Sequence, residues 1–180
     1  MFSDYVKGKK KFDFPGTVQK GIALHRFIDN FTDTHETTRI AKEIFRPAYR
    51  LYSGAITDVI YDHFLAIDDR EFTASSILVF SQATYATLEE YKELMPEKFL
   101  QLFPYMKQQD WLAGYRQKEG IRQSLRGLAR RARYLEESET AYALFEQHFQ
   151  LLQDCYRHFW SAAMPVVFKE YQLLTNNEKT

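Results

Sequence analysis

Histidine and aspartate recur at helical spacing in the stretch GIALHRFIDNFTDTHE. His25, Asp29 and Asp33 stand four residues apart. Positions four apart on an α-helix differ by only about 40°, so the three side chains form one ridge. An apolar stripe lies opposite, and Val18 and Ile22 add apolar residues on the ridge side. The pattern favours a helix that is covered on both sides, whereas a purely solvated ridge is the simpler alternative.

A second stretch, TDVIYDHFLA, carries Asp58, Asp62 and His63. Buried carboxylates need an arginine, an imidazolium or a cation, because an unpaired buried charge costs several kcal/mol. Imidazole nitrogens and carboxylate oxygens from two helices suit Mn²⁺, Fe²⁺, Mg²⁺ or Zn²⁺ in an open hydrolytic site. The spacing also fits ordinary salt bridges and a hydrogen-bonded core histidine, so both interpretations stay open here.

Helical periodicity extends along nearly the whole chain, and glycine and proline are scarce, at 7 and 5. No stretch has the alternation of a convincing strand. The sequence predicts an all-α fold, a single-domain bundle of seven or eight helices over residues 1–180. We expect helices at about 15–34, 36–50, 54–67, 73–94, from 96 onward, 119–133 and 138–174, with Pro47 and Pro104 as interruptions.

The overall charge favours neither nucleic acid nor membranes as partners, because 24 Lys and Arg balance 24 Asp and Glu. No apolar run reaches the roughly 18 to 20 residues of a membrane span. Cys155 is the only cysteine, which excludes an intramolecular disulfide and a multi-thiolate zinc site. We therefore expect a cytoplasmic protein in which Cys155 is a buried apolar residue. The sequence does not indicate an oligomeric state.

Several blocks of this sequence resemble the acyl carrier protein phosphodiesterase family. They are SDYVKG at 3–8, the segment with FP, GI, HR, ID and TD from Phe14 to Asp33, FRP and Arg50 within 41–50, DV and YDHFL within 58–65, and more weakly LRGLARR at 125–131. Members usually carry about twenty further residues, with a histidine, before the first block. We therefore expect this chain to lack a short family segment.

The resemblance implies hydrolysis of the phosphodiester between 4′-phosphopantetheine and a serine of holo acyl carrier protein, with a role in fatty acid and lipid metabolism. It also implies a divalent cation, most typically Mn²⁺, with Mg²⁺ or Fe²⁺ as alternatives, and a distant relation to HD-type phosphohydrolases. Asp62 and His63 reverse the His-Asp order of that superfamily. The alternatives are an HD-like phosphohydrolase of a small nucleotide and an inactive helical module that binds an acidic protein.

Site roles follow from the resemblance and from residue chemistry together. The predicted metal ligands are His25, Asp29, Asp62, His63 and, as a second choice, Asp4. Asp58 is a further ligand candidate or a carboxylate that orients a ligand, Asp33 is a base candidate, and Arg26 is expected to neutralise phosphate. Arg26 could equally pair with Asp29 or Asp33.

A basic segment, GIRQSLRGLARRARYLEES, places four arginines along one helical face: Arg122, Arg126, Arg130 and Arg133. We call this set the arginine strip. Acyl carrier proteins are acidic along one helix, so the arginine strip is the predicted docking site for that partner. A solvated face that pairs with the following glutamates is the alternative.

Overall fold

The computed structural model describes residues 2–176, and within this range it contains only helices and their connections. The predicted all-α class is therefore confirmed, with nine α-helices where seven or eight were expected. Their bounds are α1 Gly16–Thr34, α2 Glu36–Tyr49, α3 Ser53–Ile67, α4 Ser76–Glu90, α5 Glu97–Gln108, α6 Trp111–Gly114, α7 Lys118–Arg131, α8 Glu139–Gln147 and α9 Phe149–Asn176. Four 3₁₀ helices complete the order: η1 Phe2–Tyr5, η2 Gly8–Asp13, η3 Arg50–Tyr52 and η4 Lys92–Leu94.

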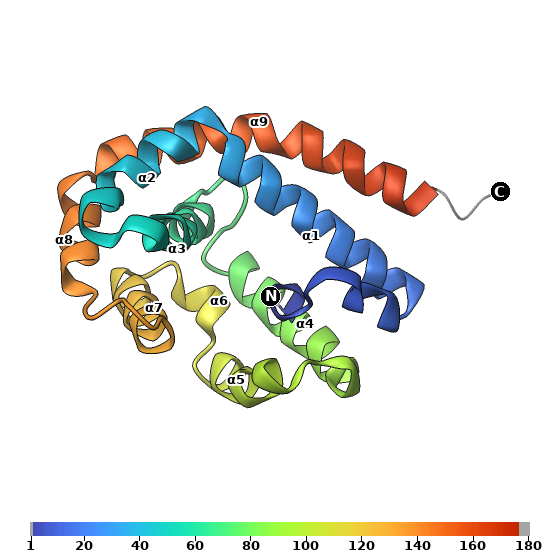
Figure 1. Ribbon diagram of the computed structural model, residues 1–180. Helices are drawn as coiled ribbons and strands as arrows, with labels where there is room; N and C mark the ends of the chain where they lie inside the picture. The colour runs from blue at the N-terminus through green and yellow to red at the C-terminus, as the bar shows by residue number, and fades with distance from the viewer. Residues whose placement is uncertain (1, 177–180) are drawn as a thin grey trace.

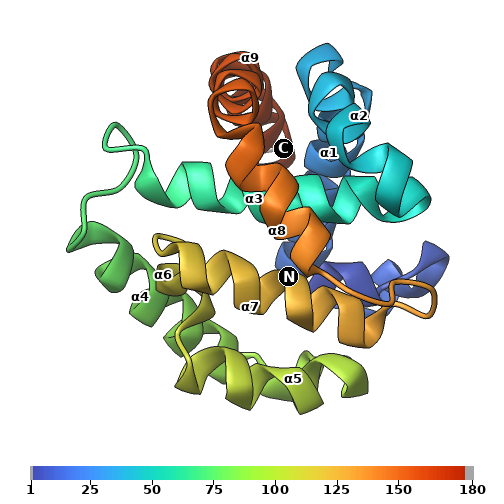
Figure 2. The same ribbon diagram turned by 90° about the vertical axis from the view of Figure 1, so that its left-hand side faces the viewer.

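The long helix α9 packs along α1 and α2, as Figure 1 shows, and α3 crosses beneath it. Figure 2 places α3 between α9 on one side and α7 on the other. These helices bury a main core of aromatic and branched side chains, which includes Phe45, Ile60, Phe64, Phe145 and Tyr156. Cys155 lies buried in the same core, as expected. This core joins α2, α3, α7, α8 and α9, and Phe31 of α1 packs against it.

A smaller second core holds α4 and α5 together, around Tyr85, Phe99 and Phe103. Tyr5 of η1 packs against Phe99, with ring centroids 5.9 Å apart, so the beginning of the described chain is attached to this second core. None of the described helices combines the length and the apolar character that a bilayer crossing requires.

Several predicted boundaries are wrong. The expected helix at 138–174 is two helices, which meet at His148. The backbone turns there without losing hydrogen bonds, because His148 donates to the Leu144 carbonyl and accepts from Leu152. Pro47 and Pro104 were expected to interrupt helices, yet each lies inside one. Pro47 lies in the last turn of α2, close to where that helix ends in any case.

The approach of α7 to α6 depends on a glycine. A Cβ atom added at Gly120 would lie 2.0 Å from the carbonyl oxygen of Gly114, whereas one added at Gly21 on α1 would meet nothing within 4 Å. We expect Gly120→Ala to lower the free energy of unfolding by about 1–3 kcal/mol, because the backbone must shift. Gly21→Ala should raise it by about 0.5–1 kcal/mol. Urea denaturation followed by circular dichroism measures both, and equal midpoints for the two variants would contradict the close approach.

Candidate active site

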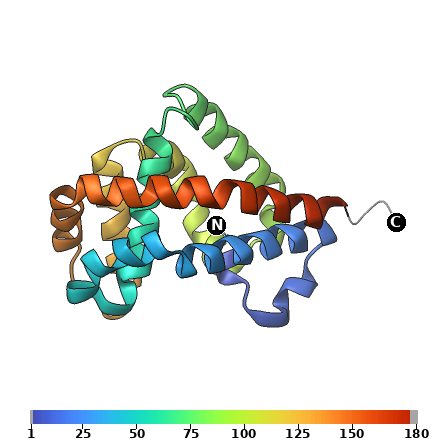
Figure 3. The ribbon, with the colours of Figure 1, turned by 90° about the horizontal axis from the view of Figure 1, so that it is seen from above.

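A pocket of about 430 Å³ lies between α1, α3 and α9. Figure 3 shows that α1 and α9 lie side by side. Its polar side comes from η1, α1 and α3 and consists of Asp4, His25, Asp29, Thr32, Asp58 and Asp62. Its apolar side comes mainly from α9 and consists of Tyr156, Phe159, Trp160, Ala163, Met164 and Val167, with Ile28, Tyr61 and Leu65 from the other two helices. One pocket therefore joins a charged region to an apolar wall.

His25 lies between two carboxylates. Its Nδ1 is 2.9 Å from an oxygen of Asp29, one helical turn later, and its Nε2 is 3.2 Å from an oxygen of Asp4. One ligand atom from each of the three residues can be chosen so that all lie within 4.8 Å of one another. Burial raises the pKa of Asp29, and the charge of His25 only partly offsets this. The predicted ridge thus brings His25 and Asp29 together and adds Asp4 from a distant part of the chain.

Arg26 explains how Asp4 reaches His25. Its guanidinium donates to the Val6 carbonyl at 2.8 Å and to the Gly8 carbonyl at 3.3 Å. Gly8 has a φ of +57°, a backbone conformation that side chains other than glycine rarely adopt. Arg26 therefore fastens the segment that follows η1 to α1. In this structure its bonds go to backbone carbonyls, and no ion pair joins it to Asp29 or Asp33.

Asp58 and Asp62 face the pocket from α3. Both retain solvent-exposed surface there, while protein atoms surround them on the other sides. The resulting desolvation, followed by the charge of Asp62, raises the pKa of Asp58 to about 7. Desolvation likewise raises the pKa of Asp62 to about 6, against a hydrogen bond from Tyr115 that lowers it. Both carboxyl groups therefore exchange protons close to neutral pH.

His63 lies elsewhere. It is 3% exposed, its ring packs against Phe145 and Phe149, and its Nδ1 is 2.7 Å from the carbonyl oxygen of Tyr115. Burial lowers its pKa, which favours the neutral ring. It does not line the pocket, so the structure separates the predicted ligand His63 from Asp62, its neighbour in the sequence. This arrangement is the hydrogen-bonded core histidine of the alternative interpretation.

Asp33 is also separated from the cluster. Its carboxylate accepts a 2.7 Å hydrogen bond from Lys42 of α2, and it does not line the pocket. Of the eight predicted metal and catalytic residues, the structure places Asp4, His25, Asp29, Asp58 and Asp62 around one pocket. It places Arg26, Asp33 and His63 in other contacts.

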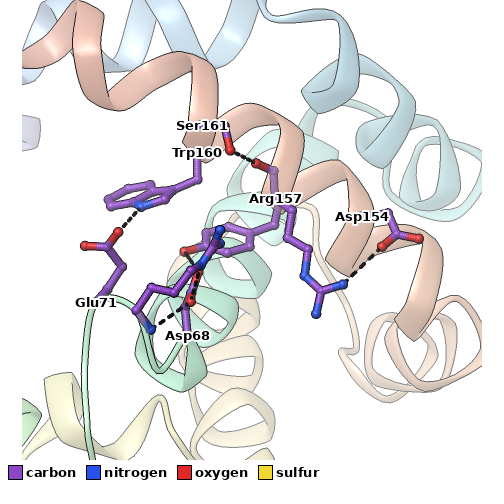
Figure 4. Close-up of polar contacts among 8 residues, drawn as sticks. Asp68, Glu71, Asp154, Arg157, Trp160 and Ser161 are labelled. Atoms are coloured by element: carbon purple, nitrogen blue, oxygen red, sulfur yellow. Dashed lines mark hydrogen bonds and ion pairs between the residues drawn. The ribbon is translucent and has the colours of Figure 1, made fainter.

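The apolar wall is anchored to the loop that follows α3. Figure 4 shows Trp160 donating from its indole nitrogen to Glu71, at 2.8 Å. The Tyr156 hydroxyl is 3.4 Å from Asp68, whose carboxylate Arg70 also binds, at 2.6 Å. Two pocket-lining rings are thus fixed at their polar edges, which keeps their apolar faces toward the cavity.

Sequence reasoning missed Tyr115 and the α9 wall. The side chain of Tyr115 hydrogen bonds Asp62 and its carbonyl oxygen accepts from His63, yet it lies in the short connection between α6 and α7, where no periodic pattern marks it. Tyr156, Phe159, Trp160 and Ala163 recur at helical spacing, a pattern typical of an ordinary core stripe. Part of that stripe instead faces a cavity.

The arginine strip is partly neutralised. Arg126 and Arg122 lie 2.9 Å and 3.4 Å from oxygens of Glu139, and Arg122 also stacks on Tyr142. Arg133 lies over its neighbour Tyr134. No carboxylate pairs with Arg130 in the described part of the chain. Part of the arginine strip is therefore paired with a glutamate, as in a solvated face, and part is left for contact with an acidic partner.

Comparison with known protein families identifies the family of the chain. A model of the acyl carrier protein phosphodiesterase family matches residues 1–163, which include every residue of the polar side of the pocket. The chain belongs to the acyl carrier protein phosphodiesterase family. It is therefore classed as an enzyme that hydrolyses phosphodiesters.

Similar curated proteins carry the same family name. The chain is 31% identical to the acyl carrier protein phosphodiesterase of Photorhabdus laumondii over 150 residues, which are 83% of this chain and 76% of that protein. It is 29% identical to the one of Yersinia pestis over 165 residues, covering 91% and 86% of the two chains. No solved structure matches, so the predicted relation to HD-type phosphohydrolases stays a prediction.

The residues of this phosphodiesterase pocket fit a divalent cation. In the part of the chain that the structure describes, four carboxylates line the pocket and His25 is its only basic lining side chain. Imidazole nitrogen and carboxylate oxygen form the donor set that Mn²⁺, Fe²⁺ and Zn²⁺ accept. Asp29 meets the second ring nitrogen of His25, the contact that orients metal-bound imidazoles in many proteins.

The attachment of the η1 segment can be tested by proteolysis. Arg26→Ala removes both hydrogen bonds to that segment, so we expect trypsin to cleave after Lys7, Lys9, Lys10 or Lys11 at least about fivefold faster, because local opening becomes easier. Arg46→Ala is the matched control, since Arg46 is exposed and pairs only with Glu43. Mass spectrometry of the first fragments measures the rates. Equal cleavage in the two variants would show that Arg26 does not fasten the segment.

The raised pKa of Asp58 predicts a pH-dependent stability. The folded protein binds this proton more tightly than the unfolded chain, so without metal the free energy of unfolding falls as pH rises from about 4 through about 7. Asp58→Asn removes this loss of stability. The melting temperature of the variant minus that of the parent protein should therefore be larger at pH 8 than at pH 4.5. Thermal melts in chelator measure the difference, with Asp154→Asn on the outer face of α9 as control. A difference independent of pH would contradict the assignment.

Proposed function

We propose that this chain hydrolyses the phosphodiester that joins 4′-phosphopantetheine to a serine of holo acyl carrier protein. Water adds to phosphorus, the bond from phosphorus to the seryl oxygen breaks, and a proton goes to that oxygen. The products are apo acyl carrier protein and 4′-phosphopantetheine. The observation that carries the proposal is the joining of the carboxylate and imidazole cluster to an apolar wall in one pocket, within a chain of this family.

Asp4 and His25, which belong with Asp29 to one group of ligand atoms within 4.8 Å, would hold the cation. Asp62 or Asp58, which line the same pocket from α3, would complete the set. A bound divalent cation, which the family resemblance suggests is Mn²⁺, would polarise the phosphodiester and lower the pKa of water. Asp29 then acts through His25, because its carboxylate fixes the ring orientation and the position of the ring proton. This role differs from the direct ligation expected from the sequence.

Asp58 is our candidate for proton transfer. Its carboxyl group lines the pocket and would accept a proton from the attacking water or return one to the leaving seryl oxygen. Asp62 is held by its hydrogen bond from Tyr115, which keeps its carboxylate directed at the pocket. The two aspartates sit one helical turn apart and would act from the same side of the substrate.

The apolar wall suits the methylene and gem-dimethyl segments of the long pantetheine arm, which stand between its two amide groups. Phe159 and Trp160 present ring surface, and Ala163 leaves room between turns of α9. The seryl side of the phosphodiester would then face the pocket mouth, because the carrier protein cannot enter a cavity of about 430 Å³. The arginine strip is our candidate for contact with acidic side chains of the carrier protein.

The hydrolytic proposal predicts activity loss from single changes. With Mn²⁺, purified protein should convert holo to apo acyl carrier protein, seen by mass spectrometry as the loss of one phosphopantetheine. His25→Ala and Asp4→Asn should each lower kcat by at least about 100-fold, because the cation loses a ligand. His158→Ala is the matched control, since His158 is exposed on α9 and does not line the pocket, and it should keep parental turnover.

Turnover measurements together with Mn²⁺ binding show which part of the hydrolytic proposal is wrong if the expected results are not obtained. Full turnover in His25→Ala or Asp4→Asn would refute the ligand assignment, whereas turnover that persists in excess chelator would refute the role of the cation. A parent protein that binds Mn²⁺ and leaves holo acyl carrier protein intact would refute the substrate and favour a small phosphodiester instead.

The arginine strip predicts a salt-sensitive effect on substrate capture. Arg126→Glu and Arg133→Glu should each raise KM for holo acyl carrier protein about tenfold at low salt and leave kcat within about twofold, because encounter with an acidic partner is weakened. Arg46→Glu on α2 introduces the same charge change elsewhere and serves as control. Steady-state kinetics at two ionic strengths measure the effect. Equal KM values in all three variants would overturn the docking assignment.

A further inference from the structure

A second pocket, of about 560 Å³, lies beside α7 and shares no lining residue with the candidate active site. It is lined by residues of α6 and α7, by Tyr115 between them, by Gln109 directly after α5 and by Val59 of α3. Among residues 2–176, no aspartate or glutamate lines it. Its charged side chains are Arg126, Arg130 and Arg131, and its neutral hydrogen-bonding groups include Ser124, Gln123 and Tyr115.

Two of the three guanidinium groups have no anionic partner in the described part of the chain. Arg126 pairs with Glu139, but no carboxylate meets Arg130 or Arg131. The Arg131 side chain lies back along α7. This is shown by one of its terminal nitrogens, which would be 3.4 Å from a Cβ atom added at Gly127. Gly127 thus leaves space for Arg131 against the helix, next to the cavity. Like charges held together without a counter-ion favour an added anion.

Hydrogen bonds link this pocket to the active site. Ser124 and Asp62 both hydrogen bond the Tyr115 side chain, and the pKa of Tyr115 is raised by burial and by the Asp62 charge. Ser124 and Tyr115 line the second pocket, whereas Asp62 lines the first. Tyr115, which lines the second pocket, therefore contacts Asp62 of the first pocket through its side chain.

We propose that the second pocket binds a phosphate group carried by a small molecule. Guanidinium groups match phosphate oxygens with paired hydrogen bonds, and Ser124 and Gln123 add neutral donors. A concave site of about 560 Å³ has the size of small-molecule pockets. This site is additional to the proposed hydrolysis, and its ligand is either free phosphate or a phosphate monoester such as 4′-phosphopantetheine.

Calorimetric titration of the metal-free full-length protein in excess chelator tests the site without relying on turnover. Inorganic phosphate and 4′-phosphopantetheine are the two probes, and pantetheine without phosphate is the control ligand. We expect saturable binding of at least one phosphate probe and none of pantetheine. Arg131→Gln should weaken it at least tenfold, and the double variant Arg130→Gln with Arg131→Gln should abolish it. Arg133→Gln, which makes the same charge change outside the pocket, should stay within about twofold.

The two probes identify the source of the phosphate. Binding of both with similar affinity assigns the site to phosphate itself, and tighter binding of 4′-phosphopantetheine assigns it to the larger molecule. No saturable binding of either probe up to about 10 mM, or equal loss in Arg131→Gln and Arg133→Gln, would overturn the proposal. Circular dichroism of each variant verifies folding. Because no metal or carrier protein is present, failure of the hydrolytic proposal leaves this result unaffected.

Discussion

The candidate site depends on the attachment of the η1 segment to α1. Asp4 is twenty-one positions from His25 in the sequence, and it reaches the imidazole because Arg26 donates to the Val6 and Gly8 carbonyls. Tyr5 secures the other side of the segment against Phe99. The sequence suggested that Arg26 binds phosphate. In the structure Arg26 instead holds the segment that brings the Asp4 carboxylate to Nε2 of His25.

Charge balance gives the pocket its chemical character. Asp4, Asp29, Asp58 and Asp62 surround a cavity whose lining contains a single imidazole, and on the far side α9 contributes aromatic rings. Desolvation raises the pKa values of Asp29, Asp58 and Asp62, and neighbouring carboxylates add to the shifts of Asp29 and Asp58. A bound cation would stabilise the ionised carboxylates, and the apolar wall would exclude water from one side of a bound phosphodiester.

The sequence predicted the helical class and the His25 and Asp29 ridge, because both follow from local periodicity. It could not separate Asp62 from His63. Adjacent positions on a helix differ by about 100°, and only the packing of α7, α8 and α9 around α3 decides which of them faces the core. Asp4 was a weaker prediction because its contact is made across the fold, and Tyr115 gave no local signal.

The origin of Asp4 also matters for how the protein is handled. Any sequence fused ahead of η1 begins beside the pocket, and a polyhistidine tag there would bring extra imidazoles to a place suited to transition metals. Such a tag would bind the ion itself and change the measured number of metal ions per protein chain. An affinity handle after α9, which ends at Asn176, keeps foreign ligands attached to the opposite end of the chain.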